Sequence, residues 1–218
     1  FFYYNETNKE KTTVSVTGQA TINSVADEIS IYIGIETLKD TAEESKDANS
    51  KISDKVLQSL YSFLDKSNVE TSSYNIYPDY DYLDSKQKLK GYRTSNVLKI
   101  KVNDFTKIGR IVDSSINSGA TSIQSINFEL SQDKQSELKK EAISKASEDA
   151  RIKAESTAKG LDSKLGKIKS VVLNEYNYYP LPYYRMDGKI ALEEAVNTEI
   201  IPTKLDVNAQ VNVVFELK

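Results

Sequence analysis

The segment NEYNYYPLPYYRMDG, residues 174–188, combines residue types that suit binding to another molecule. It carries five tyrosines around Pro180 and Pro182. Prolines hold a chain extended and remove backbone donors, and tyrosine offers rigid contact area with a polar end. The same properties would suit a connection that covers an edge of the chain's own sheet, so both alternatives stay open. The candidate interaction surface consists of Tyr176, Tyr178, Tyr179, Tyr183, Tyr184 and Arg185.

A second candidate site is GYRTSN, residues 91–96, where Arg93 precedes Ser95 and Asn96. A guanidinium with nearby polar groups could contact an anion. However, the segment has neither the glycine-rich loop nor the helix N-terminus that phosphate sites use. The alternative is that these polar groups organise the entrance of a strand by hydrogen bonds. Arg93 is therefore a candidate anion contact.

Acidic residues cluster in PDYDYLD, which contains Asp79, Asp81 and Asp84. Carboxylates this close could bind Ca²⁺, but Asp84 and Lys90 occupy the positions where an EF-hand loop has its glycine and its glutamate. A solvated hairpin tip is the alternative that we favour. We therefore expect no metal site.

The chain contains no histidine and no cysteine. This excludes Ser-His-Asp triads, Cys-His pairs and zinc sites. A group of carboxylates, Glu141, Glu148, Asp149 and Glu155, lies among lysines and Arg151. These carboxylates could do acid–base work, but ion pairs between residues four apart on a helix explain them better. We expect no catalytic residue, no cofactor and no enzymatic activity.

The charges exclude one class of partner and the first residues indicate a location. The net charge is −3 over 218 residues, with both signs interspersed, which does not fit a nucleic-acid binder. The start FFYYNETNKEK predicts that residues 1–12 are a stub left by a removed signal or membrane segment. The alternative is that its aromatic residues pack on the fold. We expect contact with a membrane only through that removed segment.

Strands and helices alternate along the chain in a pattern typical of an α+β protein. Alternating apolar residues predict strands around 12–20, 27–37, 69–82, 90–104, 122–131, 167–177 and 203–218. Thr41 and Glu44 form a capping box for a helix over about 41–65. Asp104 and Gly119 bound a second, short helix.

The longest predicted helix begins near Ser131 and is rich in alanine. Its alanines recur every fourth residue, and Gly160 with Leu161 is typical of a Schellman ending. The element order is β-β-α-β-β-α-β-α-β-β, which predicts a mainly antiparallel sheet with a long alanine-rich helix and two further helices packed on it. We expect one domain over residues 13–218, with a division near residue 104 as the alternative.

Three stretches together resemble the SIMPL-domain family. They are VSVTGQATINSVADEISIYIGIET, GYRTSNVLKIKVNDFTKIGRIVDSSINSGATSIQSINFELS and EAISKASEDARIKAESTAKGLDSKLGKIKSV, and the ending TEIIPTKLDVNAQVNVVFELK also matches. The resemblance implies an extracytoplasmic protein that is periplasmic, secreted or at the cell surface, with an N-terminal membrane anchor as one option. It also implies links to oxidative-stress defence, assembly of some members into rings, and no agreed enzymatic activity.

These observations lead to one functional prediction and one alternative. We expect a non-enzymatic extracytoplasmic protein that acts through protein contacts, mainly by forming a homo-oligomer, with a role in envelope stress protection and an unknown protein partner as further options. The alternative is a module that binds a small ligand or an anion through Arg93 and the tyrosine-rich loop.

Overall fold

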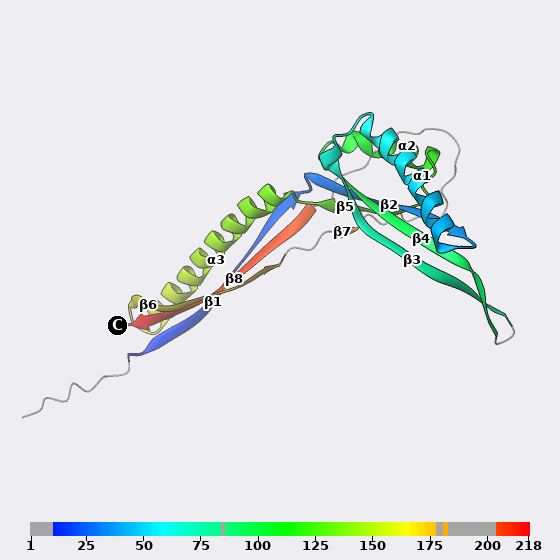
Figure 1. Ribbon diagram of the computed structural model, residues 1–218. Coiled ribbons are helices and arrows are strands. Elements are labelled where there is room, and N and C mark those ends of the chain that lie inside the picture. Colours follow the sequence, from blue (N-terminus) through cyan, green and yellow to red (C-terminus); the bar gives the residue numbers. More distant parts are fainter. Residues whose placement is uncertain (1–10, 84–85, 178–180, 183–203) are drawn as a thin grey trace, which may run out of the picture. The chain divides into compact units, whose positions relative to one another are not determined.

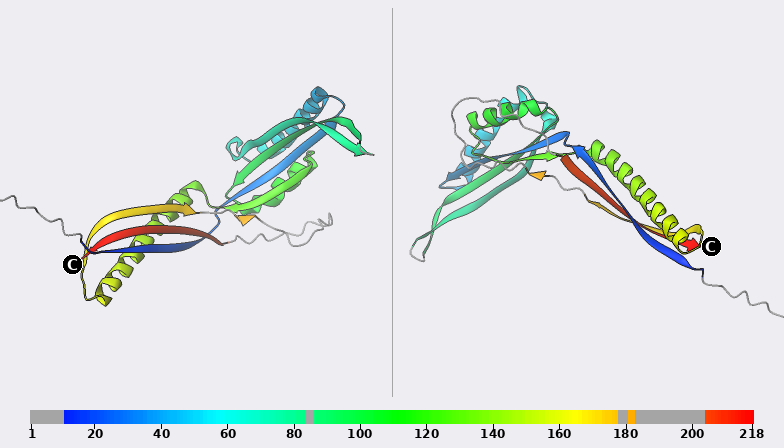
Figure 2. Two further views of the ribbon diagram at one scale, coloured as in Figure 1. Left: turned by 90° about the horizontal axis from the view of Figure 1, so that it is seen from below. Right: turned by 180° about the vertical axis from the view of Figure 1, so that it is seen from behind.

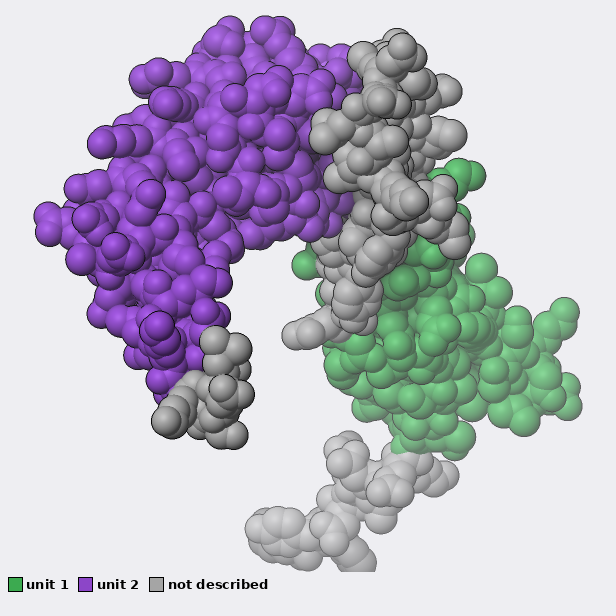
Figure 3. Space-filling view, turned by 90° about the vertical axis from the view of Figure 1, so that its right-hand side faces the viewer, with its two compact units in different colours: residues 1–25, 132–179, 204–218 green, residues 26–131, 180–203 purple. Residues whose placement is uncertain are grey.

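The computed structural model describes residues 11–83, 86–177, 181–182 and 204–218 (Figure 1). At residues 82–83, 86, 175–177 and 181–182 it describes the backbone alone. The chain divides into two compact units, shown in two colours in Figure 3. Unit 1 takes its residues from 1–25, 132–179 and 204–218, and unit 2 from 26–131 and 180–203. The predicted domain over 13–218 thus contains two units, which do not divide near residue 104.

Unit 1 is a three-stranded antiparallel sheet with one long helix on it (Figures 1 and 2). The strand order is β1 (Thr13–Val25), β8 (Lys204–Leu217) and β6 (Leu165–Asn177), and the helix is α3 (Gln132–Gly160). Alternate residues of β8 are buried beneath the helix, as the period of two predicts. They are Leu205, Val207, Ala209, Val211, Val213 and Phe215.

The alanines of α3 let the helix lie close to the sheet. Leu138 and the five alanines that follow at four-residue intervals are at most 4% exposed. A Cβ atom on Gly18 of β1 would overlap the carbonyl oxygen of Ala146 and stand 2.7 Å from the Cβ of Ala150. The helix backbone therefore rests directly on the glycine, and a side chain there would push the two elements apart.

The end of α3 differs from the prediction. Gly160 is helical, and the left-handed residue is Asp162, with φ of 51°. The N–H of Ser163 donates to the carbonyl of Ala158 at 2.9 Å and the N–H of Asp162 to that of Lys159 at 3.2 Å. These two bonds define a Schellman motif, two residues later than expected. Aspartate can take the place of glycine because it tolerates the left-handed conformation better than most residues.

Unit 2 is a five-stranded antiparallel sheet in the order β3-β4-β2-β5-β7. The strands are β2 (Glu28–Lys39), β3 (Val69–Leu83), β4 (Lys86–Val102), β5 (Ser122–Glu129) and β7 (Leu181–Pro182), and the helices are α1 (Ala42–Tyr61) and α2 (Ile108–Asn117). Short 3₁₀ turns cover Lys66–Asn68 and Phe105–Lys107. The core combines one face of the sheet with the two helices. Its fully buried members include Ile29, Ile31, Ile33, Ile35, Leu60, Leu98, Ile100 and Ile111.

Local signals predicted the start of α1 and the stop after α2, but not the end of α1. Thr41 and Glu44 form the predicted capping box, in which each side chain accepts from the other's backbone N–H. Asp104 accepts from the N–H of Thr106 at 3.1 Å and caps the 3₁₀ turn before α2. Gly119 follows α2 with φ of 108°, as expected for a glycine stop. Helix α1 ends at Tyr61 and not at residue 65. The predicted α+β class is confirmed, and the predicted element order differs from the observed one by lacking the short strand β7.

Candidate protein-interaction site

The tyrosine-rich segment lies largely outside the described residues. No side chain of Tyr176, Tyr178, Tyr179, Tyr183, Tyr184 or Arg185 is described, so this candidate surface remains a prediction. Within the segment, β7 pairs antiparallel with β5 and places Leu181 opposite Phe128 and Pro182 opposite Asn127. At these two positions the segment lies along an edge of the chain's own sheet, in keeping with one of the two alternatives.

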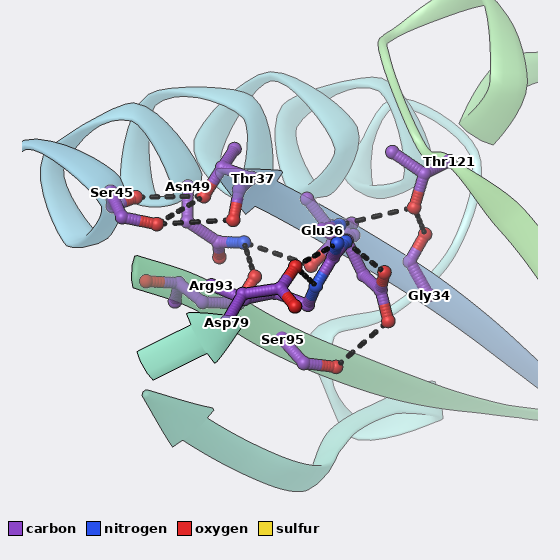
Figure 4. A network of polar contacts seen from close by, with 11 residues as sticks. Gly34, Glu36, Thr37, Ser45, Asn49, Asp79, Arg93, Ser95 and Thr121 are labelled. Carbon is purple, nitrogen blue, oxygen red and sulfur yellow. Dashed lines mark hydrogen bonds and ion pairs between the residues drawn. The ribbon is translucent and has the colours of Figure 1, made fainter. Parts of the chain in front are cut away.

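Arg93 is held by two carboxylates from neighbouring strands (Figure 4). Its terminal nitrogen donates to Oδ2 of Asp79 on β3 at 2.6 Å, and its other terminal nitrogen donates to Oε2 of Glu36 on β2 at 3.2 Å. The hydrogen bond to Asp79 raises the pKa of Arg93 above its ordinary value, and the charge of Glu36 adds to this. An incoming anion would meet both carboxylates, so the geometry favours a structural role that joins three strands.

The acidic cluster is also built into ion pairs. Asp79 binds Arg93, and the carboxylate of Asp81 lies 3.9 Å from Nζ of Lys90 across the hairpin. Asp84 falls outside the described residues. Where side chains are described, no three acidic groups lie close enough together to hold a metal ion. The described carboxylates of this hairpin therefore belong to its cross-strand pairing.

A buried polar row on α1 was not predicted. Nδ2 of Asn49 donates to the carbonyls of Ile35 at 2.8 Å and Thr94 at 3.2 Å. Ser45 exchanges hydrogen bonds with Thr37 of β2, and Ser53 accepts from Nδ2 of Asn96 at 2.9 Å. The available signal was the four-residue spacing of the three polar α1 residues, which puts them on one helix face. They fix α1 to β2 and β4 (Figure 4).

Three of the four α3 carboxylates named in the sequence analysis form the predicted ion pairs. Glu141 pairs with Lys145 at 2.9 Å and Glu155 with Arg151 at 3.1 Å, each four residues apart. Asp149 pairs with Lys153 at 2.6 Å. These side chains lie on the solvent side or along the flank of the helix. They contribute little to stability by themselves, because exposed pairs of this kind are well solvated.

One of these pairs also closes an edge of the unit 1 sheet. Asp149 accepts from the backbone N–H of Gln19 at 2.8 Å, and Nζ of Lys153 donates to the carbonyl of Thr17 at 3.0 Å. Both backbone groups belong to β1, which has β8 as its only strand neighbour among the described residues. Hydrogen bonds from Lys153 and then from Gln19 lower the pKa of Asp149. Helix α3 thus occupies positions at which another strand could pair with β1.

At the opposite edge of the same sheet, β6 has β8 as its only strand neighbour among the described residues, and several of its exposed side chains are apolar. Four side chains of β6, which we call the β6 strip, are 51–59% exposed: Ile168, Val171, Val172 and Leu173. The strip is exposed because α3 packs mainly on β1 and β8 and only slightly on β6. Pairing with β8 places Val171 and Leu173 on the helix-covered face, opposite Val213 and Val211, and Val172 on the other face, opposite Asn212.

The sequence contained a sign of this strip. Residues 171–173 are three consecutive apolar residues in a strand, so both faces of the strand are apolar there. Such a strand is normally covered on both sides. Strand order was needed to see that β6 lies at an edge, and strand order follows from long-range pairing that the local pattern does not contain.

The fold and the site define a class of α+β proteins with two compact units and a candidate surface for protein contacts. Within this class, the chain belongs to the SIMPL family, whose model, described as a protein of unknown function (DUF541), matches residues 14–215. The match includes residues of both units.

Two bacterial relatives cover most of the chain. The uncharacterized protein YggE of Escherichia coli K12 is 26% identical over 206 residues, which is 94% of this chain and 83% of that protein. The 26 kDa periplasmic immunogenic protein of Brucella melitensis is 27% identical over 226 residues, covering 100% of this chain and 90% of the relative. None of the described helices combines the length and apolar character that a membrane crossing requires.

Proposed function

We propose that this chain is a non-enzymatic extracytoplasmic protein that acts through protein contacts, and that its main contact is with further copies of itself. The β6 strip carries this proposal. Four neighbouring apolar side chains stand more than half exposed on an edge strand, where a flat hydrophobic edge attracts another strand. Covering the strip would remove apolar surface from water and complete the hydrogen bonding of the edge.

The extracytoplasmic location is supported by the name of one relative. The Brucella melitensis relative is named a periplasmic protein. Anchoring, and a role in envelope stress protection, belong to the same proposal and rest on the family resemblance.

The alternative of an anion-binding module has less support. Arg93 has both of its terminal nitrogens within 3.2 Å of carboxylate oxygens from Asp79 and Glu36. A ligand would have to displace an acidic partner that is already well placed. The non-enzymatic part of the proposal is supported by the absence of histidine and cysteine, which removes the usual base and nucleophile near neutral pH.

The test is the mass of the protein in solution over a wide range of concentrations, by light scattering or sedimentation. We expect a discrete oligomer whose association weakens in the double variant Val171→Ser/Leu173→Ser. The control is Ile152→Ser, because Ile152 is 55% exposed on α3, outside the strip. A wild-type chain that is monomeric at every concentration would overturn the proposal.

The tyrosine-rich segment receives a parallel test. Changing Tyr178, Tyr179, Tyr183 and Tyr184 to Ser should also weaken assembly if this segment is an interface. If the oligomer is unaffected, the segment covers the chain's own surface instead. The two sets of variants thus separate the contributions of the two surfaces.

A further inference from the structure

We propose that β6 pairs with β6 of a second copy, antiparallel and about a two-fold axis through Val172. This inference rests on the proposed self-assembly and specifies its partner and its register. The resulting sheet would be continuous and would contain three strands from each copy.

Among the described residues, the central part of β6 is the sheet edge with the fewest features that prevent another strand from pairing with it. Strand β1 is closed by Asp149 and Lys153. Strand β3, an edge of the unit 2 sheet, contains Pro78 and has register irregularities in two places, features that discourage strand addition. Strand β6 has register irregularities of its own against β8 on both sides of its centre, but residues 170–174 lie between them, pair regularly with β8 and contain no proline, glycine or charge.

The sequence of β6 is complementary to itself when it is reversed about Val172. In that register Val172 lies opposite its own copy, Val171 opposite Leu173, and Ser170 opposite Asn174. Further out, Lys169 already forms an ion pair with Glu216 at 3.3 Å. Between residues 170 and 174, apolar residues therefore meet apolar residues and polar residues meet polar residues, which are pairings that stabilise neighbouring strands.

Registers centred one residue away lack this complementarity. A centre at Val171 would set Ser170 against Val172 and Lys169 against Leu173. A centre at Leu173 would set Val172 against Asn174, and Val171 against the glutamate at position 175. Each alternative places polar or charged residues against the apolar strip. The register about Val172 is thus favoured by several pairs at once.

The position of α3 explains how the strip would be covered. The two-fold axis of an antiparallel strand pair is perpendicular to the sheet, so the α3 helices of both copies would lie on the same face. Val171 and Leu173 of each copy share that face and are left uncovered by their own helix. They would form an apolar strip between the two helices, and the two Val172 side chains would meet on the opposite face.

The first experiment uses the fact that residue 172 faces itself. Val172→Lys and Val172→Glu each place two like charges at the axis, and each should raise the dissociation constant of the homodimer at least about tenfold. An equimolar mixture of the two variants should restore association as a one-to-one heterodimer. Ile152→Lys and Ile152→Glu are the controls, because Ile152 and Val172 are both 55% exposed. All four should keep the wild-type circular dichroism and melting temperature.

The second experiment uses a milder change. The chain has no cysteine, so Val172→Cys introduces one thiol per copy. A mild oxidant should then convert the protein to a disulfide-linked dimer, whereas Ile152→Cys should remain largely uncrosslinked. This variant tests the same contact without a buried charge, so it answers the question even if the charged variants fold poorly.

The outcomes separate this inference from the proposed function. If the wild-type chain is an oligomer but Val172→Lys leaves its association unchanged and Val172→Cys does not crosslink, the β6 pairing is wrong and self-assembly uses another surface. Association that fails to return in the mixture overturns the two-fold register. A wild-type monomer overturns both proposals and leaves a strand of another protein as the occupant of β6.

Discussion

The three-stranded sheet of unit 1 has two edge strands, β1 and β6, and these differ in how the helix α3 covers them. At β1, polar side chains of α3 reach down and bind the backbone of Thr17 and Gln19. At β6, the helix makes few contacts, and valine, leucine and isoleucine side chains remain more than half exposed. One helix therefore closes one edge and leaves the other available. The difference indicates that openness at β6 is a specific feature and not a general property of the sheet.

The largest expected effect comes from the glycine that brings α3 onto β1. Gly18→Ala adds a Cβ that overlaps the helix backbone at Ala146, so the helix must move away from the closed edge. We expect the free energy of unfolding of unit 1 to fall by about 1–3 kcal/mol. Thermal unfolding followed by circular dichroism measures this loss.

The control for that variant is Gly109→Ala in α2. A Cβ on Gly109 would meet nothing within 4 Å, and alanine favours a helix over glycine. We expect this variant to unfold at the wild-type temperature or above. Equal destabilisation by the two substitutions would contradict the close approach at Gly18.

A smaller effect is expected from removing the side chains that close β1. The double variant Asp149→Ala/Lys153→Ala exposes two backbone groups of β1 and should lower the melting temperature slightly while adding concentration-dependent association. Arg151→Ala/Glu155→Ala removes an ion pair of the same spacing from the same helix, but this pair makes no hydrogen bond to the described residues of β1. This control variant should neither lower the melting temperature nor add association. Light scattering measures the association of the two double variants. Equal association of both would contradict the closure of β1 by Asp149 and Lys153.

The smallest effect concerns pH. Hydrogen bonds from Lys153 and Gln19 lower the pKa of Asp149 below its ordinary value of 3.8 in the folded chain. A carboxyl whose folded pKa is depressed stabilises the fold fully above its unfolded pKa, and this contribution disappears as the pH falls through the folded value. Closure of β1 should therefore hold at neutral pH and weaken only in acid below about pH 4. Melting temperatures measured against pH should decline less steeply in Asp149→Asn than in the wild type.

Local patterns predicted most elements of the fold. The capping box at Thr41, the strand alternation around Leu98 and the ion pairs of α3 all depend on residues within a few positions of one another. Such signals act through short-range geometry, so the sequence contains them directly. The late end of α3 was missed because Asp162, and not Gly160, adopts the left-handed conformation.

Long-range pairing produced the features that could not be predicted. The two units arise because residues 13–25 pair with residues 204–216, and no local pattern contains that match. The partners of Arg93 came together in the same way, since Glu36, Asp79 and Arg93 meet only through the registers of β2, β3 and β4. The edge position of β6 likewise required the strand order. The candidate surface that sequence did identify, the tyrosine-rich segment, remains a prediction.

The hydrogen bonds from Asp149 and Lys153 to β1 also limit how many further copies one molecule can bind through the edges of this sheet. A sheet with two open edges can add a copy at each end, and repeated addition produces an indefinite filament. With β1 closed, the described residues of unit 1 offer one strand edge, at β6, so strand pairing through this sheet stops once two copies have met. Two side chains on one helix would thus separate a finite assembly from polymerisation.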